Sequence, residues 1–567
     1  MANDNFVGLT DAQIAAAASE VDPVLLAQGI ELIHAEKEVP LRKALRYHWR
    51  AMAWSMFLSL ALVMDGYDGA VSNAFFGLPS FVNTFGVVVN GKKGVPANWQ
   101  SALQNVGIPG GFLGLFLCGW CQERFGSRKT YLGGMCFAIL CVFLFVFANS
   151  LGMLLAAEAI AACAWAIFNT LTAAYAAEIC PIQLRGYSTS FISMCWGMGS
   201  FIASGVDRGA LNIQGNWGWR MAYAVQWAWP VPLAIAAFFA PESPWWLVRK
   251  GRIDDAKKVL NRISMKGYWE DRNIDAYIEV IKHTDVLERA QAKSGSFWEI
   301  WKGTNLRRTE IQMGVWACQV FSGTAMTAYA VEFLEDAGMS TTTAFNFGIL
   351  INGMNLIGCL IDFVLMTRFG RRTLILCGLN VLALMLVLIG VFGSVTPTHA
   401  TLQGIGACCA VINLAYHASV GPLTYTVAAE VPASRLRARS VAWGRASYTI
   451  MYNATAQLTP RMVSAVDWNW GAKAAYFWLG GNLGVTIWAF FRLPETRGLS
   501  YAEMEILFAN RISARKFGHV KVHDEAAAGD AKFADPEGGD EADEKEKGVV
   551  YHNETVQQPQ VAATLEG

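Results

Sequence analysis

The sequence predicts an all-α membrane protein with twelve spanning helices, arranged as two related six-helix halves. Three observations favour this class: the composition, the number of long apolar runs, and a set of loop motifs that occurs twice. Apolar residues make up 54% of the 567 residues and charged residues only 16%. Because soluble chains carry about a quarter charged residues, we expect much of the surface to face lipid rather than water.

The apolar runs have about the length that a spanning helix needs, roughly 20 residues. Those of the first half lie near 50–74, 99–120, 130–148, 151–177, 187–206 and 221–240. Those of the second half lie near 309–333, 343–366, 373–393, 402–428, 440–463 and 473–493. The predicted organisation is an N-terminal segment (1–48), a six-helix bundle (49–240), a linker of short soluble helices (241–308), a second six-helix bundle (309–493) and a largely disordered tail (494–567).

Basic residues indicate which loops face the cytoplasm. They gather before the first run, in alternate loops and at the start of the linker, with Arg42, Arg128, Arg249, Arg371 and Arg435 as examples. The intervening loops carry few. By the positive-inside rule, both termini and the linker are predicted to be cytoplasmic. The net charge of zero gives no indication of a nucleic-acid partner.

Three loop motifs recur in the same order in both halves. Their second copies follow at offsets of 244, 252 and 253 residues. The pairs are Arg124-Phe125-Gly126 with Arg368-Phe369-Gly370, Ala177-Glu178 with Ala429-Glu430, and Pro241-Glu242 with Pro494-Glu495. Such a duplication predicts a substrate site near the midplane, between halves that move against each other.

These motifs, together with AEICPIQLRG at 177–186 and PETRGLS at 494–500, resemble the sugar porters of the major facilitator superfamily. The likeness covers roughly residues 45–510. MDGYD at 64–68 and the block at 216–233 resemble the fungal α-glucoside (maltose-type) permeases more closely. Related fungal hexose and β-glucoside porters share parts of these patterns.

Ionisable side chains inside the predicted helices indicate a coupling site, since each costs roughly 2.5–3.5 kcal/mol in a bilayer and normally faces a cavity or a partner. Asp65 and Asp68 lie three residues apart on one helix face, and Glu158 and Arg445 lie in other helices. The resemblance implies that Asp68 takes up and releases a proton, with Arg445 as its charge partner. A permanent structural ion pair is the alternative.

Two positions depart from the family pattern. Glu158 stands where general sugar porters carry an arginine, although maltose-type relatives also carry an acid there. Gly111 stands where those relatives often carry a glutamate, and Asp362 is a candidate to compensate.

The resemblance also implies a sugar-binding set of Gln319, Asn355, Tyr425, Ser193 and Ser200. The two serines replace glutamines of the family pattern, and shorter side chains leave room for a disaccharide. Hydrogen bonds between helices are the alternative role for each polar residue.

A third set is expected to form a cytoplasmic latch of arginine–carboxylate pairs, closed when the site faces outward. Its members are Arg124, Glu178, Arg185, Glu242, Arg368, Glu430, Arg437 and Glu495. Ordinary topological charge is the alternative.

Together these features predict a proton-coupled importer of an α-linked glucose disaccharide such as maltose, monomeric and in the plasma membrane. Alternatives are another sugar (cellobiose, lactose or a hexose), a facilitative uniporter, or a nutrient sensor with little transport. We expect no enzyme activity, cofactor or metal site. The tail lysines, Lys516, Lys521, Lys532, Lys545 and Lys547, indicate the ubiquitination machinery as a partner.

Overall fold

The computed structural model describes residues 22–89, 92–269, 272–293, 297–433, 436–464, 467–497, 499, 504 and 507–518. The chain through Gly518 forms one compact unit. Most of the predicted tail, with all its candidate lysines except Lys516, lies outside the described residues.

The first half contains a helix or a set of successive helices at each predicted span. These are α3 (Leu41–Ser59) with α4 (Ala61–Ala74), α6 (Ala97–Asn105) with α7 (Gly107–Phe125), α8 (Ser127–Val146), α9 (Leu151–Ile179), α10 (Ile182–Ala210), and α11 (Trp217–Ala224) with η2 (Val225–Ala228) and α12 (Pro230–Phe239).

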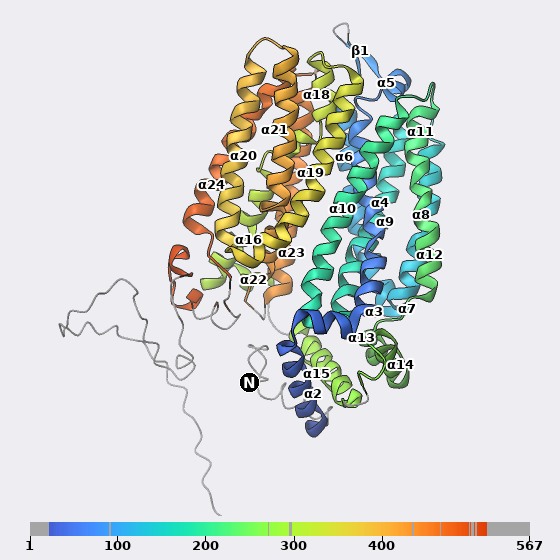
Figure 1. Cartoon of the computed structure of the whole chain (residues 1–567), viewed down its shortest axis with the longest axis vertical. Coiled ribbons are helices and arrows are strands. Elements are labelled where there is room, and N and C mark those ends of the chain that lie inside the picture. Colours follow the sequence, from blue (N-terminus) through green and yellow to red (C-terminus); the bar gives the residue numbers. More distant parts are fainter. Residues whose placement is uncertain are drawn as a thin grey trace, which may run out of the picture. The chain divides into compact units, whose positions relative to one another are not determined.

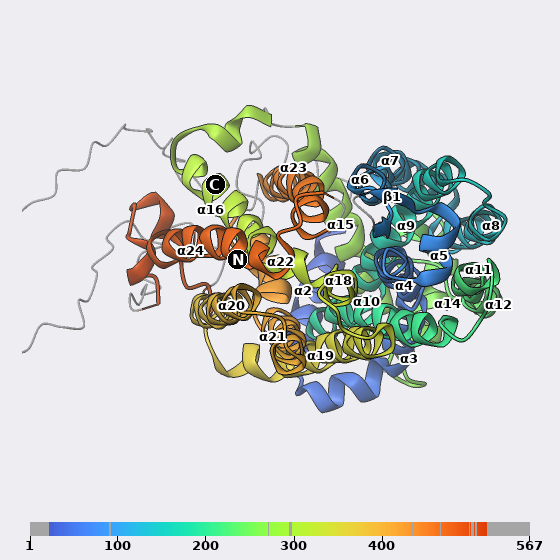
Figure 2. The same cartoon turned by 90° about the horizontal axis from the view of Figure 1, so that it is seen from above.

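The second half repeats the arrangement (Figures 1 and 2). Its spans are α16 (Gly303–Val320) with α17 (Thr324–Thr327) and α18 (Ala330–Asp336), α19 (Thr341–Arg368), α20 (Arg371–Ser394), α21 (His399–His417) with α22 (Val420–Glu430), α23 (Arg437–Val463), and η5 (Gly471–Ala474) with α24 (Ala475–Arg492). The break after α16 falls at Gly323, whose φ of 93° is left-handed and favours glycine. The predicted all-α architecture of two six-helix halves is confirmed.

Within the described residues, eight spans are long and apolar enough to cross a membrane by composition alone. The spans that fall short are α3–α4, α10, α16–α18 and α23. All four contribute polar side chains to internal cavities, among them Asp65, Ser200, Gln319 and Arg445. Their lower hydropathy is therefore explained by a face that points away from lipid.

Short elements outside the predicted spans mark one end of the helices. They are α5 (Pro79–Phe85) and the antiparallel pair β1 (Val87–Val89) and β2 (Lys92–Gly94). They lie at the same end as α18 (Figure 1). We call this end the β1 end.

The opposite end carries the helices of the linker, α13 (Pro244–Arg249), α14 (Ile253–Ile263) and α15 (Ile274–Lys293), and we call it the α13 end (Figure 1). In α14 the buried side chains Ala256, Leu260 and Ile263 recur at helical spacing. An unpredicted helix, α2 (Pro23–Glu38), packs on α15, with Gly29 close to the backbone of Ala276.

The packed region also extends further toward the C-terminus than expected. Phe508 and Phe517 are buried, and their ring centroids lie 5.1 Å apart. The first part of the predicted tail, up to Gly518, therefore belongs to the folded unit.

Candidate functional site

Two adjoining cavities lie between helices of the two halves. The first has a volume of about 440 Å³ and is lined mainly by α4, α10, α16–α19, α21 and α22. The second, of about 840 Å³, is lined by α7, α9, α10, α19, α22 and α23. Both share Ser193, Trp196, Cys359, Pro422 and Tyr425, so the two spaces meet.

At the β1 end, hydrogen bonds join the two halves. Those between described residues are Ala97–Asp467 (3.1 Å), Asn98–Arg461 (3.2 Å), Gln100–Glu332 (2.9 Å), Ser204–Asn352 (2.7 Å) and Arg208–Asn346 (3.0 Å). The second cavity instead reaches residues further toward the α13 end, such as Leu115, Met366 and Ala429. The halves are thus held together at the β1 end and enclose space toward the α13 end.

All five residues of the predicted sugar-binding set line the first cavity. Ser193 and Tyr425 lie where the two cavities meet. Gln319 Nε2 donates to the Gly421 carbonyl (3.3 Å). Ser200 Oγ donates to the carbonyls of Gly66 and Trp196 (3.1 and 3.2 Å). Ser200 therefore also serves helix packing, which was the alternative role.

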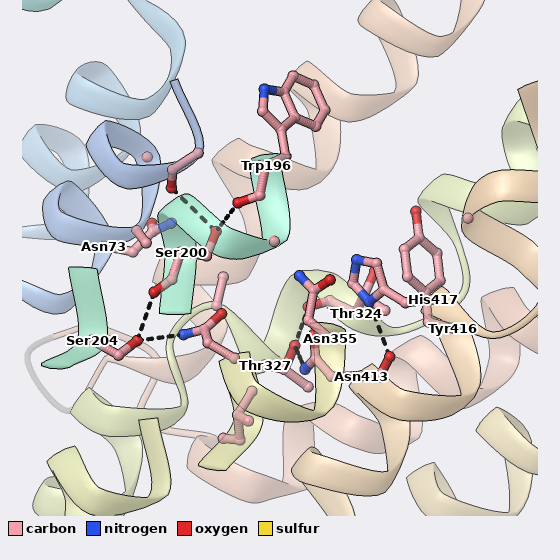
Figure 3. Close-up of a pocket in the computed structure, with 18 of the residues that line it drawn as sticks. Asn73, Trp196, Ser200, Ser204, Thr324, Thr327, Asn355, Asn413, Tyr416 and His417 are labelled. Atoms are coloured by element: carbon pink, nitrogen blue, oxygen red, sulfur yellow. Dashed lines mark hydrogen bonds between the residues drawn. The ribbon is translucent and has the colours of Figure 1, made fainter. Parts of the chain in front are cut away.

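Several further polar residues, none of them in the predicted sugar-binding set, line the same cavity (Figure 3). Asn413 Nδ2 donates to Thr327 Oγ1 (2.9 Å), and His417 Nδ1 lies 2.9 Å from the Asn413 carbonyl. Asn352 Nδ2 donates to Ser204 Oγ. A signal was present, because Asn413 and His417 are four residues apart in an apolar run and so lie on one helix face.

The cavity also offers aromatic surface beside these polar groups. Trp196, Tyr416, Tyr425 and Tyr448 all line it. A pyranose presents hydroxyl groups at its edge and C–H groups on its face, and sites for such molecules combine hydrogen-bonding groups with apolar walls. The lining therefore suits a small polyhydroxylated molecule.

Asp65 is the acidic residue of the coupling set that lines the first cavity. Its Oδ2 accepts hydrogen bonds from Trp196 Nε1 and Asn169 Nδ2, both at 2.9 Å. These donors come from α10 and α9, so the carboxyl group ties α4 to both neighbours.

Asp68, one turn further along α4, is 4% exposed and is not among the residues that line either cavity. Its two oxygens accept from Gln226 Nε2 (2.7 Å) and Trp165 Nε1 (3.0 Å). Its carboxyl group also lies within hydrogen-bonding reach of Glu158. Two ionised carboxylates so close together would repel each other, so a proton on one of the two favours this arrangement.

Glu158 is positioned by a short chain of hydroxyl groups. Ser72 Oγ donates to Glu158 Oε1 (2.8 Å) and lies 3.2 Å from the hydroxyl of Tyr223. The pair of Asp68 and Glu158 is thus enclosed by neutral donors from α4, α9, α11 and η2.

Arg445 lies elsewhere, at the second cavity. Its guanidinium group lies over the rings of Trp316 (5.1 Å), Tyr425 (5.9 Å) and Tyr448 (4.6 Å), and it donates to the Tyr425 hydroxyl (3.4 Å). In the described part of the chain, no ion pair joins it to Asp68. Asp362 and Gly111 line the same cavity.

Two glutamates of the predicted latch instead bind helix N-termini, in the same way in each half. Glu242 accepts from the backbone N–H groups of Ser127 (2.8 Å) and Arg128 (3.2 Å) at the start of α8. Glu495 accepts from Arg371 (2.8 Å) and Arg372 (3.2 Å) at the start of α20. Burial raises the pKa of Glu242, although these backbone donors favour its ionised form.

The glycines before these helices are required by the same contacts. A Cβ at Gly126 or Gly370 would collide with the carboxyl group of Glu242 or Glu495, respectively. The repeated Phe-Gly and Pro-Glu motifs therefore meet in space and form one structural unit in each half.

Other arginines than those expected pair with the remaining latch carboxylates. Glu178 pairs with Arg249 (2.7 Å), and Glu430 pairs with Arg371 (3.4 Å). Arg124 lies over the ring of Trp120 (5.5 Å) and forms no ion pair with a described carboxylate. Arg368 also forms no ion pair with a described carboxylate, and its backbone carbonyl accepts a hydrogen bond from Arg497. The side chains of Arg185 and Arg437 lie outside the described residues.

Two related six-helix halves around a central cavity, held together at one end, define a membrane transporter of the major facilitator type. The chain belongs to the sugar transporter family, because the family model described as "Sugar (and other) transporter" matches residues 54–508. It is a transporter and not an enzyme.

The chain is also similar to yeast permeases. A general alpha-glucoside permease of Saccharomyces cerevisiae is 37% identical over 493 residues, which cover 86% of this chain and 80% of the permease. The maltose permease MAL31 of the same species is 35% identical over 504 residues, with 88% and 82% covered.

Solved structures show the same fold. The proton:xylose symporter XylE bound to 6-bromo-6-deoxy-D-glucose superimposes with a TM-score of 0.61 at 20% identity, covering 82% of this chain and 99% of that one. An inward open conformation of XylE from E. coli gives 0.61 at 17% identity, with 81% and 99% covered.

Proposed function

We propose that this protein imports an α-glucoside, with a maltose-like disaccharide as the substrate, together with a proton across the plasma membrane. The names of its yeast relatives support this substrate class. The adjoining cavities, with polar and aromatic walls, support a substrate larger than a single hexose. Gln319, Asn355, Tyr425, Ser193 and Ser200 would bind it from both halves.

The contact between Asp68 and Glu158 is the observation that carries the proton coupling. Two carboxyl groups this close together hold one shared proton more favourably than two negative charges, and the neighbouring donors are all neutral. When the helices around the pair move, the cost of keeping a second negative charge there changes. Proton uptake and release then follow the conformation, and Asp65 would link the pair to the cavity through α4.

The orientation follows from the basic residues. If the α13 end is cytoplasmic, as the positive-inside rule predicts, the bonds at the β1 end close the outer side, and this structure faces inward. In the outward-facing state the ion pairs at the α13 end would take part in the latch. The monomeric state and ubiquitination of the tail stay predictions.

The test is sugar accumulation in liposomes that contain the purified protein, with a more acidic medium outside than inside. We expect maltose to accumulate above its outside concentration, and a protonophore to abolish the accumulation. Cellobiose, lactose and glucose should compete less well than maltose. Uptake that only equilibrates and ignores the protonophore would indicate a uniporter and contradict the proposal.

A further inference from the structure

Asp207, near the end of α10, is a buried carboxyl group that the proposed coupling site does not use. It is 1% exposed and lies among the residues that line the first cavity. Neither of its carboxylate oxygens has a hydrogen-bonding partner in the described part of the chain. It thus differs from Asp65 and Asp68, which accept from two side chains each.

No ion pair between described residues includes Asp207, so its carboxyl group has no compensating charge. The titratable side chains of Tyr67 on α4 and Tyr223 on α11 lie close enough to interact electrostatically with its carboxyl group. The Tyr67 hydroxyl donates to the Ala222 carbonyl (2.7 Å), and the Tyr223 hydroxyl lies 3.2 Å from Ser72 Oγ. The next residue, Arg208, donates a hydrogen bond to Asn346 of α19.

An ionised carboxylate in such a position would be buried without a donor or a cation. Burial of an uncompensated charge is among the costliest arrangements in a protein, and a group that can neutralise itself does so. The protonated acid is therefore the form that fits this conformation.

The place of Asp207 connects its charge to the closure of the β1 end. Ser204, one turn earlier on α10, binds Asn352, and Arg208 binds Asn346. Both bonds cross between the halves, so separation of the halves at this end would break them. Asp207 would then meet water, in which an aspartate is ionised above about pH 4.

We propose that Asp207 is a second proton-binding site, and that the β1 end closes only when this carboxyl group is protonated. This inference rests on the proposed alternation between two conformations. Asp207 takes up and releases its proton at the β1 end, so it sets the pH dependence of closure. The pair of Asp68 and Glu158 carries the proton that crosses the membrane.

The test measures the distance across the β1 end with two spin labels, on cysteines replacing Asn83 of α5 and Thr342 of α19. Both positions are exposed and belong to different halves. In every sample Cys121, Cys136 and Cys377, the cysteines that are not buried, are replaced by serine. Distance distributions are recorded in lipid nanodiscs over a range of pH.

In the otherwise native protein, we expect the long-distance population to increase as the pH rises. In Asp207→Asn, which is always neutral, the short distance should persist at every pH. Asp207→Glu should restore the pH dependence.

A native pH profile in Asp207→Asn, or a flat profile in the otherwise native protein, would overturn the inference. A raised KM for sugar in Asp207→Asn with an unchanged profile would also overturn it, in favour of a sugar ligand. Sugar accumulation is measured in parallel on the native protein. If sugar does not accumulate but the distance still depends on pH, the proposed function is contradicted and this inference is not. If sugar accumulates but the distance does not depend on pH, this inference is contradicted and the proposed function is not.

Discussion

The acidic residues of the first half differ in what surrounds them, and this difference separates their roles. Asp65 faces the cavity and is held by two neutral donors. Asp68 lies behind the cavity wall and meets another carboxyl group, Glu158. Of these two arrangements, the second is the one in which a shared proton relieves repulsion between two carboxylates.

Among the sugar-binding candidates, Asn355 allows a controlled test. It is 9% exposed and lines the first cavity. Asn355→Ala should raise the KM for sugar about 3- to 10-fold, since a hydrogen bond to a neutral partner contributes about 0.5–1.5 kcal/mol. The matched control is Asn380→Ala, because Asn380 is exposed on α20 and donates only within its own helix. Equal KM values for the two variants in uptake assays would exclude Asn355 from the site.

Which single residues could be predicted depended on contrast with their surroundings. Asp65 could be predicted because an ionisable side chain is conspicuous in an apolar run, whereas Gln319 and Asn355 followed from the family resemblance. The partner of Asp68 could not be predicted in this way. Glu158 is 90 residues away in the sequence, and the choice between it and Arg445 depends on how the helices pack. Arg445 instead lies among three aromatic rings.

At the scale of elements, the most informative feature is the repeated contact between a glutamate and a helix N-terminus. Glu242 binds the start of α8, and Glu495 binds the start of α20. A carboxylate there satisfies backbone N–H groups that have no partner within the helix, and it interacts favourably with the helix dipole.

Glu242→Ala and Glu495→Ala should each lower the stability of the protein by about 0.5–2 kcal/mol, the range measured for loss of an N-terminal cap. Thermal unfolding in detergent or nanodiscs measures this as a lower midpoint. Glu123→Ala is the control, because Glu123 is exposed near the end of α7. If all three variants unfolded at the same temperature, the glutamates would not act as caps.

The sequence predicted the spans but not every element. Spans were found because their length and hydropathy are imposed by the bilayer. The helix α2 and the strands β1 and β2 were missed, since elements too short to span a bilayer carry no such constraint. The order of the motifs along the chain revealed that they are repeated. The contact between Gly126 and Glu242 within one copy, however, forms only in the tertiary structure.

At the scale of the whole molecule, two similar halves allow one binding site to face either side of the membrane. The internal repeat revealed the halves, whereas the conformation was not predictable, since both states share one sequence. The structure shows one state, with the halves bonded at the β1 end and the second cavity toward the α13 end.

The most direct test of the account follows proton entry itself. Sugar is added to unbuffered liposomes that contain the protein, and the pH of the outer medium is recorded together with sugar exchange. We expect sugar to make the medium more alkaline with the native protein, and Asp68→Asn to abolish this change while it still exchanges sugar. A native rise in pH with Asp68→Asn would show that protons enter without this carboxyl group, and would contradict the account.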